Sequence, residues 1–279
     1  MAEREYREVS YDTWEKMAPG WQRRRAYMWD VSHAVGEQLV EKLEPRPGQT
    51  ILELACGVGD TGFAAAGVLG DSGKLIATDF SPRMLEAARQ RAEELGLGNV
   101  EFRVIDAEKM DLDDDSVDGV LCRWGYMLMS DPAAAFAETR RVLREGGRLS
   151  FSVWGPAERN QWAAIAGGAI VASGHLPPPE PGAPGIFALA DPSRIRELVT
   201  GGGFSAPEIE EVELEYRFAD FDEYWQFMNE LAGAFALAIR ELSDEDKNAV
   251  RESMRDSAAS FERDGAYVFP GVAINVVAS

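Results

Sequence analysis

The chain contains 279 residues, of which 46% are hydrophobic and 27% are charged. This balance is typical of a globular protein and excludes a chain that is disordered throughout. Asp and Glu number 48 against 28 Lys and Arg, so the formal net charge is −20. Such a surface repels phosphate backbones and anionic lipid headgroups, and only Arg23, Arg24 and Arg25 form a basic cluster. We therefore expect no nucleic-acid partner and no binding to an anionic membrane surface.

Other features of the sequence bear on where the protein works. No run of residues approaches the roughly 18 apolar residues that a membrane span needs. Residues 1–10 lack the basic-then-apolar pattern of a secretion signal. The two cysteines, Cys56 and Cys122, are too few for a disulfide framework. The expectation is a cytoplasmic protein without a membrane span.

The residues before position 45 predict a helical segment. Pro45, Pro47 and Gly48 end the pattern. Aromatic side chains are frequent near its start, and those within the first 30 positions are Tyr6, Tyr11, Trp14, Trp21, Tyr27 and Trp29. Large rings on a helix either pack it against a core or form the wall of an apolar pocket. Both interpretations remain open at this point.

Between positions 50 and 154, short apolar runs alternate with helical patterns. The predicted strands are 50–55, 74–79, 100–105, 117–122 and 148–154. The predicted helices are 61–69, 84–95 and 132–145, and Gly146 and Gly147 end the last of them. Ser81 before Pro82 and Asp131 before Pro132 are typical helix starts. This alternation predicts an α/β fold, with right-handed crossovers and a doubly wound, mostly parallel sheet.

The alternation changes after position 155. Residues 156–186 contain a proline-rich stretch, 175–182, and predict a loop or insertion. Asp191 before Pro192 begins another helix, which Gly201–Gly203 end. Residues 207–218 alternate apolar and acidic side chains, 221–263 are helical in pattern, and 267–277 predict the last strand. We expect the last two strands to form an edge hairpin with the final strand antiparallel, which completes a seven-stranded Rossmann-like sheet.

The segment ELACGVGDTG, residues 53–62, joins the first predicted strand to the first predicted helix. Glycines let the backbone approach a ligand closely, and a helix N-terminus offers free N–H groups. Asp79 ends the next strand, where an acid can accept hydrogen bonds from a ribose diol. The glycine loop and Asp79 together predict a nucleoside-containing cofactor at the carboxyl edge of the sheet.

The identity of that cofactor depends on charge. Gly57, Gly59 and Gly62 match the G-x-G-x-x-G dinucleotide pattern, which keeps an NAD(P)-dependent Rossmann oxidoreductase as an alternative. Glu53 and Asp60 oppose it because two carboxylates repel a pyrophosphate. At about 4 Å, one like-charge contact costs roughly 4 kcal/mol when the effective dielectric constant is near 20. A cationic nucleoside without phosphate, such as S-adenosylmethionine, reverses the sign.

ILELACGVG, residues 51–59, resembles motif I of class I S-adenosylmethionine-dependent methyltransferases. Further segments follow in the family's order: TDFSPRML (78–85), VIDAE (104–108), DDDSVD (113–118) and VLREGGRL (142–149). RWGYM (123–127), Asp131-Pro132 and NQW (160–162) resemble the UbiE-like subgroup. The resemblance covers about residues 48–155. Its implied fold is the same Rossmann-like sheet, and its implied cofactor is S-adenosylmethionine, which becomes S-adenosylhomocysteine.

The resemblance implies roles for residues near the methionine and ribose moieties of the cofactor. Glu53 would face the methionine ammonium, directly or through water. Ala55, Gly57 and Gly59 would line the methionine and the ribose. Asp79 would accept hydrogen bonds from both ribose hydroxyls. Ala55 stands where the family has the first glycine of its loop, and its methyl group narrows the gap beside the methionine.

The same resemblance implies contacts to the adenine. Phe80 and Met84 would pack on the ring. Asp106 would accept a hydrogen bond from the adenine amino group, and the Ala107 amide would lie nearby.

Residues 122–125, CRWG, would border the methyl group, through the backbone at Arg123 and the ring of Trp124. This segment lacks the Asn/Asp-Pro-Pro-aromatic signature of enzymes that methylate planar nitrogens. Methylation of nucleic-acid bases is therefore disfavoured.

Methyl transfer from a sulfonium is an in-line displacement with an activated leaving group. Alignment alone is worth about 7–11 kcal/mol in favourable cases, and a base is needed only when the acceptor must lose a proton. His33 and His175 are the histidine candidates for such a base, and neither is compelling, so the catalytic residues stay unknown. No metal-ligand spacing is evident, and no metal is expected.

The sequence thus predicts a division into regions. These are an N-terminal helical lid at 1–44, a cofactor-binding Rossmann-like core at 45–155, an insertion or cap at 156–186, and a completion of the sheet at 187–279 with a helical cap insertion at about 221–263. The expected partners are a small, hydrophobic or aromatic methyl acceptor and, at most, a second copy of the chain in a homodimer. A non-catalytic cofactor-binding protein remains a further alternative.

Overall fold

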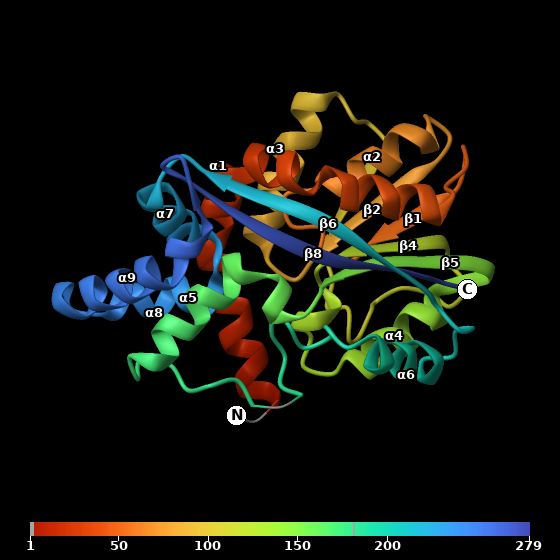
Figure 1. The fold of residues 1–279 in the computed structure, drawn as a ribbon. Helices are drawn as coiled ribbons and strands as arrows, with labels where there is room; N and C mark the ends of the chain where they lie inside the picture. The colour runs from red at the N-terminus through yellow and green to blue at the C-terminus, as the bar shows by residue number, and fades with distance from the viewer. Residues whose placement is uncertain (1–2, 181) are drawn as a thin grey trace.

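The computed structural model describes residues 3–180 and 182–279. Predictions for positions 1 and 2 of the N-terminal segment and for Pro181 of the insertion lie outside the described residues. The described chain forms one mixed sheet with helices on both faces, and further helices gather beyond one end of the sheet (Figure 1). Among the described residues, no helix combines the length and the apolar character that crossing a bilayer requires.

The sheet follows the predicted topology. Its parallel strands are β1 (Thr50–Glu53), β2 (Lys74–Asp79), β3 (Val100–Val104), β4 (Val117–Arg123) and β5 (Leu143–Trp154). Its antiparallel strands are β6 (Glu208–Phe218), β7 (Glu262–Arg263) and β8 (Ala266–Ala278). The strand order is β3-β2-β1-β4-β5-β8-β6, and β7 pairs only with β8. The Rossmann-like sheet with an antiparallel last strand is therefore confirmed, and the two-residue β7 is an addition to the seven predicted strands.

The helices fall into two groups. Those that cover the sheet are α1 (Glu3–Leu43), α2 (Asp60–Leu69), α3 (Pro82–Leu95), α4 (Pro132–Val142) and α6 (Pro192–Gly201). Those that gather beyond its end are α5 (Gln161–Ala172), α7 (Phe221–Leu231), α8 (Gly233–Glu241) and α9 (Asp244–Ala258). Short 3₁₀ turns are η1 (Tyr126–Leu128), η2 (Ala157–Arg159) and η3 (Ala259–Phe261). The predicted N-caps are confirmed, because the side chains of Ser81, Asp131 and Asp191 each accept a backbone N–H of their helix.

Two predicted boundaries were wrong. The helix expected to reach Glu145 ends at Val142, and β5 begins at Leu143, because Leu143 pairs with Val117 of β4. Gly146, with φ +76°, belongs to this strand and does not stop a helix. The segment interpreted as a loop or insertion contains α5, a helix of mostly small and apolar residues in which Trp162 is buried.

Helix α1 links the sheet to the loops at its carboxyl edge. Its C-terminal half packs on the sheet through Val35, Leu39 and Leu43. Pro19 lies inside the helix, where a proline removes a hydrogen bond and bends the axis. The red and the orange-red parts of α1 accordingly run in different directions in Figure 1. This bend carries the N-terminal half past the edge of the sheet.

Strands β6 and β8 also extend beyond the sheet. Strand β5 ends at Trp154, which pairs with Ala273 of β8. The pairing of β6 with β8 continues as far as Phe218 with Tyr267. The overhanging hairpin, cyan and dark blue in Figure 1, connects the sheet to α7, α8 and α9. It places aromatic residues of β6 beside the carboxyl edge of the parallel strands.

Candidate active site

The glycine loop after β1 is tightly folded. Ala55, Gly57 and Gly59 have φ values of +49°, +54° and +94°. A Cβ atom on Gly59 would lie 2.3 Å from the ring of Phe63, whereas one on Gly57 would meet nothing within 4 Å. The loop therefore packs closely onto α2 at Gly59, and its backbone at Gly57 is open to a ligand. Ala55 occupies a left-handed conformation that favours glycine, which accounts for the glycine at this place in the family.

Glu53 reaches from the end of β1 to the first turn of α2. Its Oε1 accepts a hydrogen bond from the Gly62 N–H at 2.8 Å, and its Oε2 is buried without a partner. The residue is only 2% exposed. Burial raises the pKa of the Glu53 carboxyl to about 8, although the Gly62 N–H and Arg123 oppose this shift. Because a buried acceptor without a partner is unfavourable, the bare oxygen indicates a place for a cationic ligand group.

Asp79 is held from the end of β2. Its Oδ2 accepts a hydrogen bond from the Gly57 N–H at 3.0 Å, and its Oδ1 accepts one from the Ser81 N–H at 2.9 Å. Burial raises the pKa of the Asp79 carboxyl to about 6, against the effect of these backbone donors. Each carboxylate oxygen keeps a second lone pair for a hydroxyl donor. Asp79 and Glu53 thus both bind the glycine loop, from neighbouring parallel strands.

Side chains of α1 contact the residues predicted to bind adenine. The Tyr11 ring meets the Phe80 ring edge-on, with centroids 6.0 Å apart. Met84 is buried in a small cluster that Trp14 and Trp21 of α1 join. Asp106 forms an ion pair with Arg7, and its Oδ1 also accepts a hydrogen bond from the Glu108 N–H. Ala107, next in the chain, packs partly buried against the main core.

Two further polar contacts join α1 to the rim. Glu15 Oε1 accepts hydrogen bonds from the Ser81 hydroxyl at 2.6 Å and the Arg83 N–H at 3.0 Å. Arg25 Nη1 lies 3.0 Å from Asp60 Oδ1 at the start of α2. Helix α1 therefore lies across the loops after β1, β2 and β3. In this structure the predicted cofactor residues and the predicted lid are in contact.

The end of β4 presents Arg123 and Trp124. Arg123 donates from Nε to Thr61 Oγ1 at 2.8 Å and from Nη1 to Ser32 Oγ at 2.9 Å. Trp124 has a left-handed φ of +63°, and its buried Nε1 has no partner. A Cβ on the following Gly125 would lie 2.8 Å from the Ala55 Cβ, so this turn packs directly on the glycine loop. The sequence indicated only backbone contacts at Arg123, whereas in the structure its side chain also binds residues of α1 and α2.

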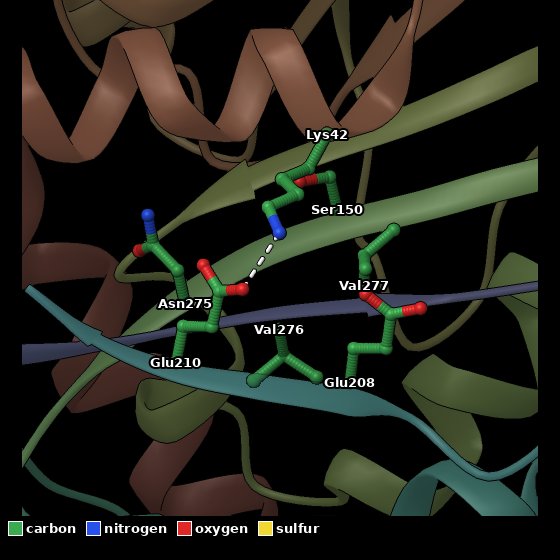
Figure 2. A pocket seen from close by; sticks show the side chains of 7 residues that line it. All are labelled: Lys42, Ser150, Glu208, Glu210, Asn275, Val276 and Val277. Atoms are coloured by element: carbon green, nitrogen blue, oxygen red, sulfur yellow. Dashed lines mark hydrogen bonds and ion pairs between the residues drawn. The ribbon is translucent and has the colours of Figure 1, made fainter.

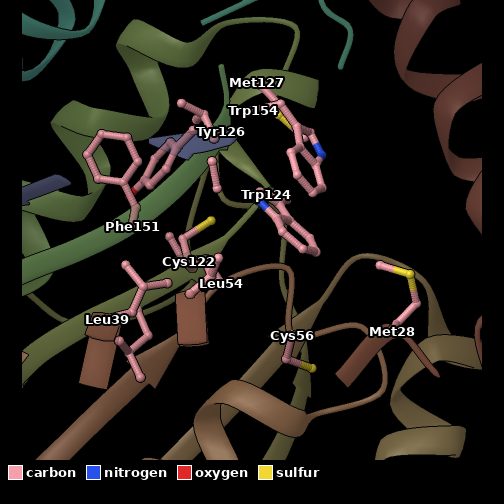
Figure 3. Packing of buried hydrophobic residues seen from close by; sticks show 14 of the residues in the cluster. Met28, Leu39, Leu54, Cys56, Cys122, Trp124, Tyr126, Met127, Phe151 and Trp154 are labelled. Carbon is pink, nitrogen blue, oxygen red and sulfur yellow. The ribbon is translucent and has the colours of Figure 1, made fainter. Parts of the chain in front are cut away.

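A wall of aromatic rings leads away from Trp124. The Trp124 ring stacks on Trp154, with centroids 4.1 Å apart, and Figure 3 shows this pair above Cys56 of the glycine loop. The rings of Trp154 and Trp162 are 5.1 Å apart, and Trp162 stacks on Tyr216 at 4.4 Å. Sequence reasoning did not single out Tyr216 for this wall, although the alternation in its strand placed it on the apolar face. Its hydroxyl is buried without a partner.

The other candidates lie apart from this site. His33 is exposed on α1, with Nδ1 2.9 Å from the Asp30 carbonyl oxygen. His175 follows α5, and its Nε2 lies 3.7 Å from Asp246 of α9. Cys56 and Cys122 are buried free thiols whose pKa burial raises. The histidine positions give neither residue a contact with Glu53, Asp79 or Trp124, so no histidine is assigned as a base.

A small pocket opens at a different place. It lies between the last turn of α1 and strands β5, β6 and β8, and Lys42 Nζ lies 2.7 Å from Glu210 Oε1 across it (Figure 2). None of the predicted cofactor residues lines this pocket. Within residues 3–180 and 182–279, no cluster of three or more His, Cys, Asp or Glu side chains has an arrangement that could hold a metal ion.

Comparison with known proteins identifies the class to which this fold and site belong. Residues 45–169 match the family model described as a methyltransferase domain. Residues 45–169 thus form a methyltransferase domain, and its relatives support S-adenosylmethionine as the cofactor. Because the match is to methyltransferases, it disfavours the nicotinamide-dependent alternative.

Individual relatives give the same class. The chain is 40% identical over 115 residues to the ubiquinone/menaquinone biosynthesis C-methyltransferase UbiE of Acidiphilium cryptum, which covers 40% of this chain and 45% of that protein. It is 35% identical over 118 residues to the aklanonic acid methyltransferase DauC of Streptomyces sp. strain C5, which covers 42% of this chain and 54% of that protein. The chain thus spans about half the length of these curated relatives.

The fold also has relatives among solved structures. The YcgJ protein of Bacillus subtilis aligns with a TM-score of 0.61 at 20% identity, over 88% of this chain and 97% of that one. At this identity the likeness concerns the fold alone.

Proposed function

We propose that this protein transfers the methyl group of S-adenosylmethionine to a small, largely hydrophobic or aromatic acceptor. The observation that carries the proposal is the bare oxygen of Glu53, buried against Gly62 at the end of a glycine loop whose backbone is open at Gly57 and is bound by the Asp79 carboxyl. A buried acid with a free lone pair is matched by an ammonium group and opposed by a phosphate. The methyltransferase relatives support the same reaction class.

The residues present fit S-adenosylmethionine. Glu53 would hold the methionine ammonium, and the backbone at Gly57 and Gly59 would lie along the methionine and the ribose. Asp79 would accept the ribose hydroxyls with the lone pairs that Gly57 and Ser81 leave free. Because α1 side chains now contact Phe80 and Asp106, adenine binding requires the N-terminal half of α1 to shift.

The aromatic wall supports an apolar acceptor. Trp124, Trp154, Trp162 and Tyr216 form a continuous chain of ring contacts from the glycine loop to the overhanging hairpin. Such walls exclude water and favour planar or hydrophobic molecules. The names of two relatives, UbiE and the aklanonic acid methyltransferase DauC, indicate methylation of small organic molecules by those proteins.

The chain's own residues would act by binding and alignment. When bound, the cofactor supplies a methyl group on a positively charged sulfur, already activated for displacement. Glu53 fixes the amino-acid end of the cofactor, Asp79 fixes its ribose, and Trp124 holds the acceptor in line while excluding water. The geometry assigns no proton transfer to a named side chain. An acceptor that reacts without losing a proton first, or that is already ionised, suits this arrangement.

The proposal is tested by binding and turnover. We expect calorimetry to detect S-adenosylhomocysteine binding, and a screen of phenols, quinones, polyketides and amines to yield S-adenosylhomocysteine with at least one acceptor. With that acceptor, Trp124→Leu should lower kcat/KM by about tenfold or more while changing cofactor affinity little. Trp225→Leu on α7 is the matched control and should retain activity. Absence of cofactor binding at millimolar concentration would contradict the proposal.

A further inference from the structure

Arg123 is a positively charged side chain that forms no ion pair with a described acidic residue. Its guanidinium donates to the neutral hydroxyls of Thr61 and Ser32 and lies over the Trp124 ring, 4.6 Å from the ring centroid. No carboxylate of the described residues lies within ion-pair distance of it. A guanidinium offers five N–H donors in a rigid fork, so most of its capacity is unused. Burial lowers the pKa of Arg123 below its usual value, which reflects the cost of removing a cation from water. Such a group calls for an anionic ligand.

Glu53 is the matching acid, and it has no cationic partner among the described residues. In the register of β1 with β4, Glu53 pairs with Leu121, so Arg123 lies two residues further along on the same face of the sheet. Asp60, which pairs with Arg25, and Glu53 both act on Arg123 electrostatically, yet neither forms an ion pair with it within 4.0 Å. Glu53 keeps a bare Oε2, and Arg123 keeps free N–H groups. The face between α2 and α1 thus holds an acid and a base that are not paired with each other.

Neighbouring hydroxyl groups fix the orientation of the Arg123 guanidinium. Ser32 Oγ donates to the Met28 carbonyl oxygen at 2.5 Å, so it presents a lone pair to Arg123 Nη1. Thr61, in the first turn of α2, accepts from Nε. The guanidinium is therefore anchored at Nε by α2 and at Nη1 by α1, and the N–H groups of Nη2 are left for an anion.

We propose that Arg123 binds the α-carboxylate of the methionine moiety of S-adenosylmethionine while Glu53 binds its ammonium. An α-amino acid carries both charges on one carbon, so it matches a separated acid and base better than any singly charged group does. The inference rests on the proposed function and adds a side-chain role at Arg123. It also explains why a cation without an acid partner is present beside the glycine loop.

The test compares two ligands that differ only in the carboxylate. Calorimetry measures the Kd of S-adenosylhomocysteine and of its decarboxylated analogue for the full-length protein at one pH. We expect the wild type to prefer S-adenosylhomocysteine by about thirtyfold, the value of a charge-assisted bidentate contact. Arg123→Met should reduce this preference to about threefold or less, and Arg123→Lys should give an intermediate ratio because it keeps charge but loses the fork.

Two control variants locate the effect. Arg194→Met removes an exposed guanidinium on α6 that contacts only Glu197, and it should leave the ratio unchanged. Glu53→Gln should weaken both ligands alike, because both carry the ammonium, and should keep the ratio. Comparing two ligands on one preparation cancels any loss of folded protein.

Other outcomes overturn the inference in distinguishable ways. A wild type that binds both ligands equally well, or an Arg123→Met variant that keeps the full preference, would show that the carboxylate is bound elsewhere. If Arg123→Met instead raised only the KM of the acceptor, Arg123 would belong to the acceptor site. A wild type that binds neither ligand would contradict the proposed function itself.

Discussion

The buried carboxyl of Glu53 has one oxygen that accepts a hydrogen bond and one oxygen without a partner. This buried position determines its protonation state. Burial raises the pKa of the carboxyl to about 8, so the free protein holds a proton there at neutral pH. An ammonium ligand binds the ionised form. Cofactor binding must therefore release this proton, and affinity is linked to pH.

We predict that the affinity for S-adenosylhomocysteine rises by up to about tenfold per pH unit between about pH 6.5 and 7.5. The affinity rises with pH because at higher pH a smaller fraction of the free protein carries the Glu53 proton that the cofactor must displace. Glu53→Gln should bind more weakly and lose this slope. Calorimetry in buffers of different ionisation enthalpy measures the released proton directly, and a pH-independent affinity of the wild type would contradict the assignment.

The raised pKa of Glu53 also makes the stability of the free protein depend on pH. The folded-state pKa of Glu53 lies above the ordinary value of 4.5, so the folded state binds the proton more tightly than the unfolded state. The resulting stabilisation is present at pH below the ordinary pKa and is lost as pH rises through about 8. Asp79, with a pKa raised to about 6, acts in the same direction at lower pH.

Residue 62 must be a glycine because Glu53 leaves no room for a side chain there. A Cβ at this position would lie 2.0 Å from Glu53 Oε2, whereas one on Gly67 in the same helix would meet nothing within 4 Å. We predict that Gly62→Ala destabilises the protein by about 1–3 kcal/mol and weakens cofactor binding. Gly67→Ala should stabilise it by about 0.5–1 kcal/mol. Urea unfolding measures both changes, and equal effects at the two sites would contradict this geometry.

At the scale of elements, two long pieces of secondary structure enclose the candidate site. Helix α1 crosses the loops after β1, β2 and β3, and the hairpin of β6 and β8 extends past the edge of the sheet (Figure 1). The sequence predicted the first as a lid and the second only as an edge hairpin. We infer that the cofactor binds under the N-terminal half of α1 and the acceptor against the hairpin.

Asn160 joins the cap helix α5 to the sheet. Its Nδ2 donates to three carbonyl oxygens, those of Gly155, Pro156 and Val272, and its Oδ1 accepts from the Val272 N–H and Trp162 Nε1. The residue is fully buried. These bonds fix Trp162 of the aromatic wall relative to β8.

We predict that Asn160→Asp destabilises the protein by about 3 kcal/mol or more, because a buried carboxyl would face three carbonyl oxygens without a donor. Asn229→Asp is the matched control, since Asn229 donates only to the carbonyl of Trp225 on its own helix. The free energies of unfolding in urea provide the measurement. If both substitutions had the same small effect, Asn160 would not hold the cap to the sheet.

At the scale of the whole molecule, charge is the dominant property. The basic cluster noted in the sequence faces acids, because Arg23 and Arg24 pair with Glu230 and Arg25 pairs with Asp60. These three arginines therefore form no free basic patch on a chain whose net charge is −20. Repulsion among these acids opposes the compact state.

We predict that raising NaCl from about 0.02 M to about 0.2 M increases the thermal midpoint of unfolding, because salt screens the net repulsion over distances near 10 Å. Sodium sulfate at equal ionic strength should act in the same direction. Calorimetric or circular dichroism melting curves supply the measurement. A midpoint that falls with NaCl would show that the surface ion pairs contribute more than the net charge.

The sequence by itself determined the order of strands and helices, the glycine loop and the placing of acids at strand ends. These features depend on local chemistry. A serine or aspartate before a proline starts a helix, and an apolar run followed by glycines ends a buried strand. The resemblance to methyltransferases followed from the same short segments, since the cofactor is bound largely by loops that directly follow strands.

Only the tertiary structure decided the start of β5, the contacts of α1 and the surroundings of Arg123. Leu143 is a strand residue because it pairs with Val117, and Arg123 meets Ser32 only after α1 folds back over the sheet. Tyr216 joins Trp162 because β6 and β8 extend together beyond β5. Burial, and with it the pKa of Glu53, depends on segments distant in the chain, so no local pattern of residues can encode it.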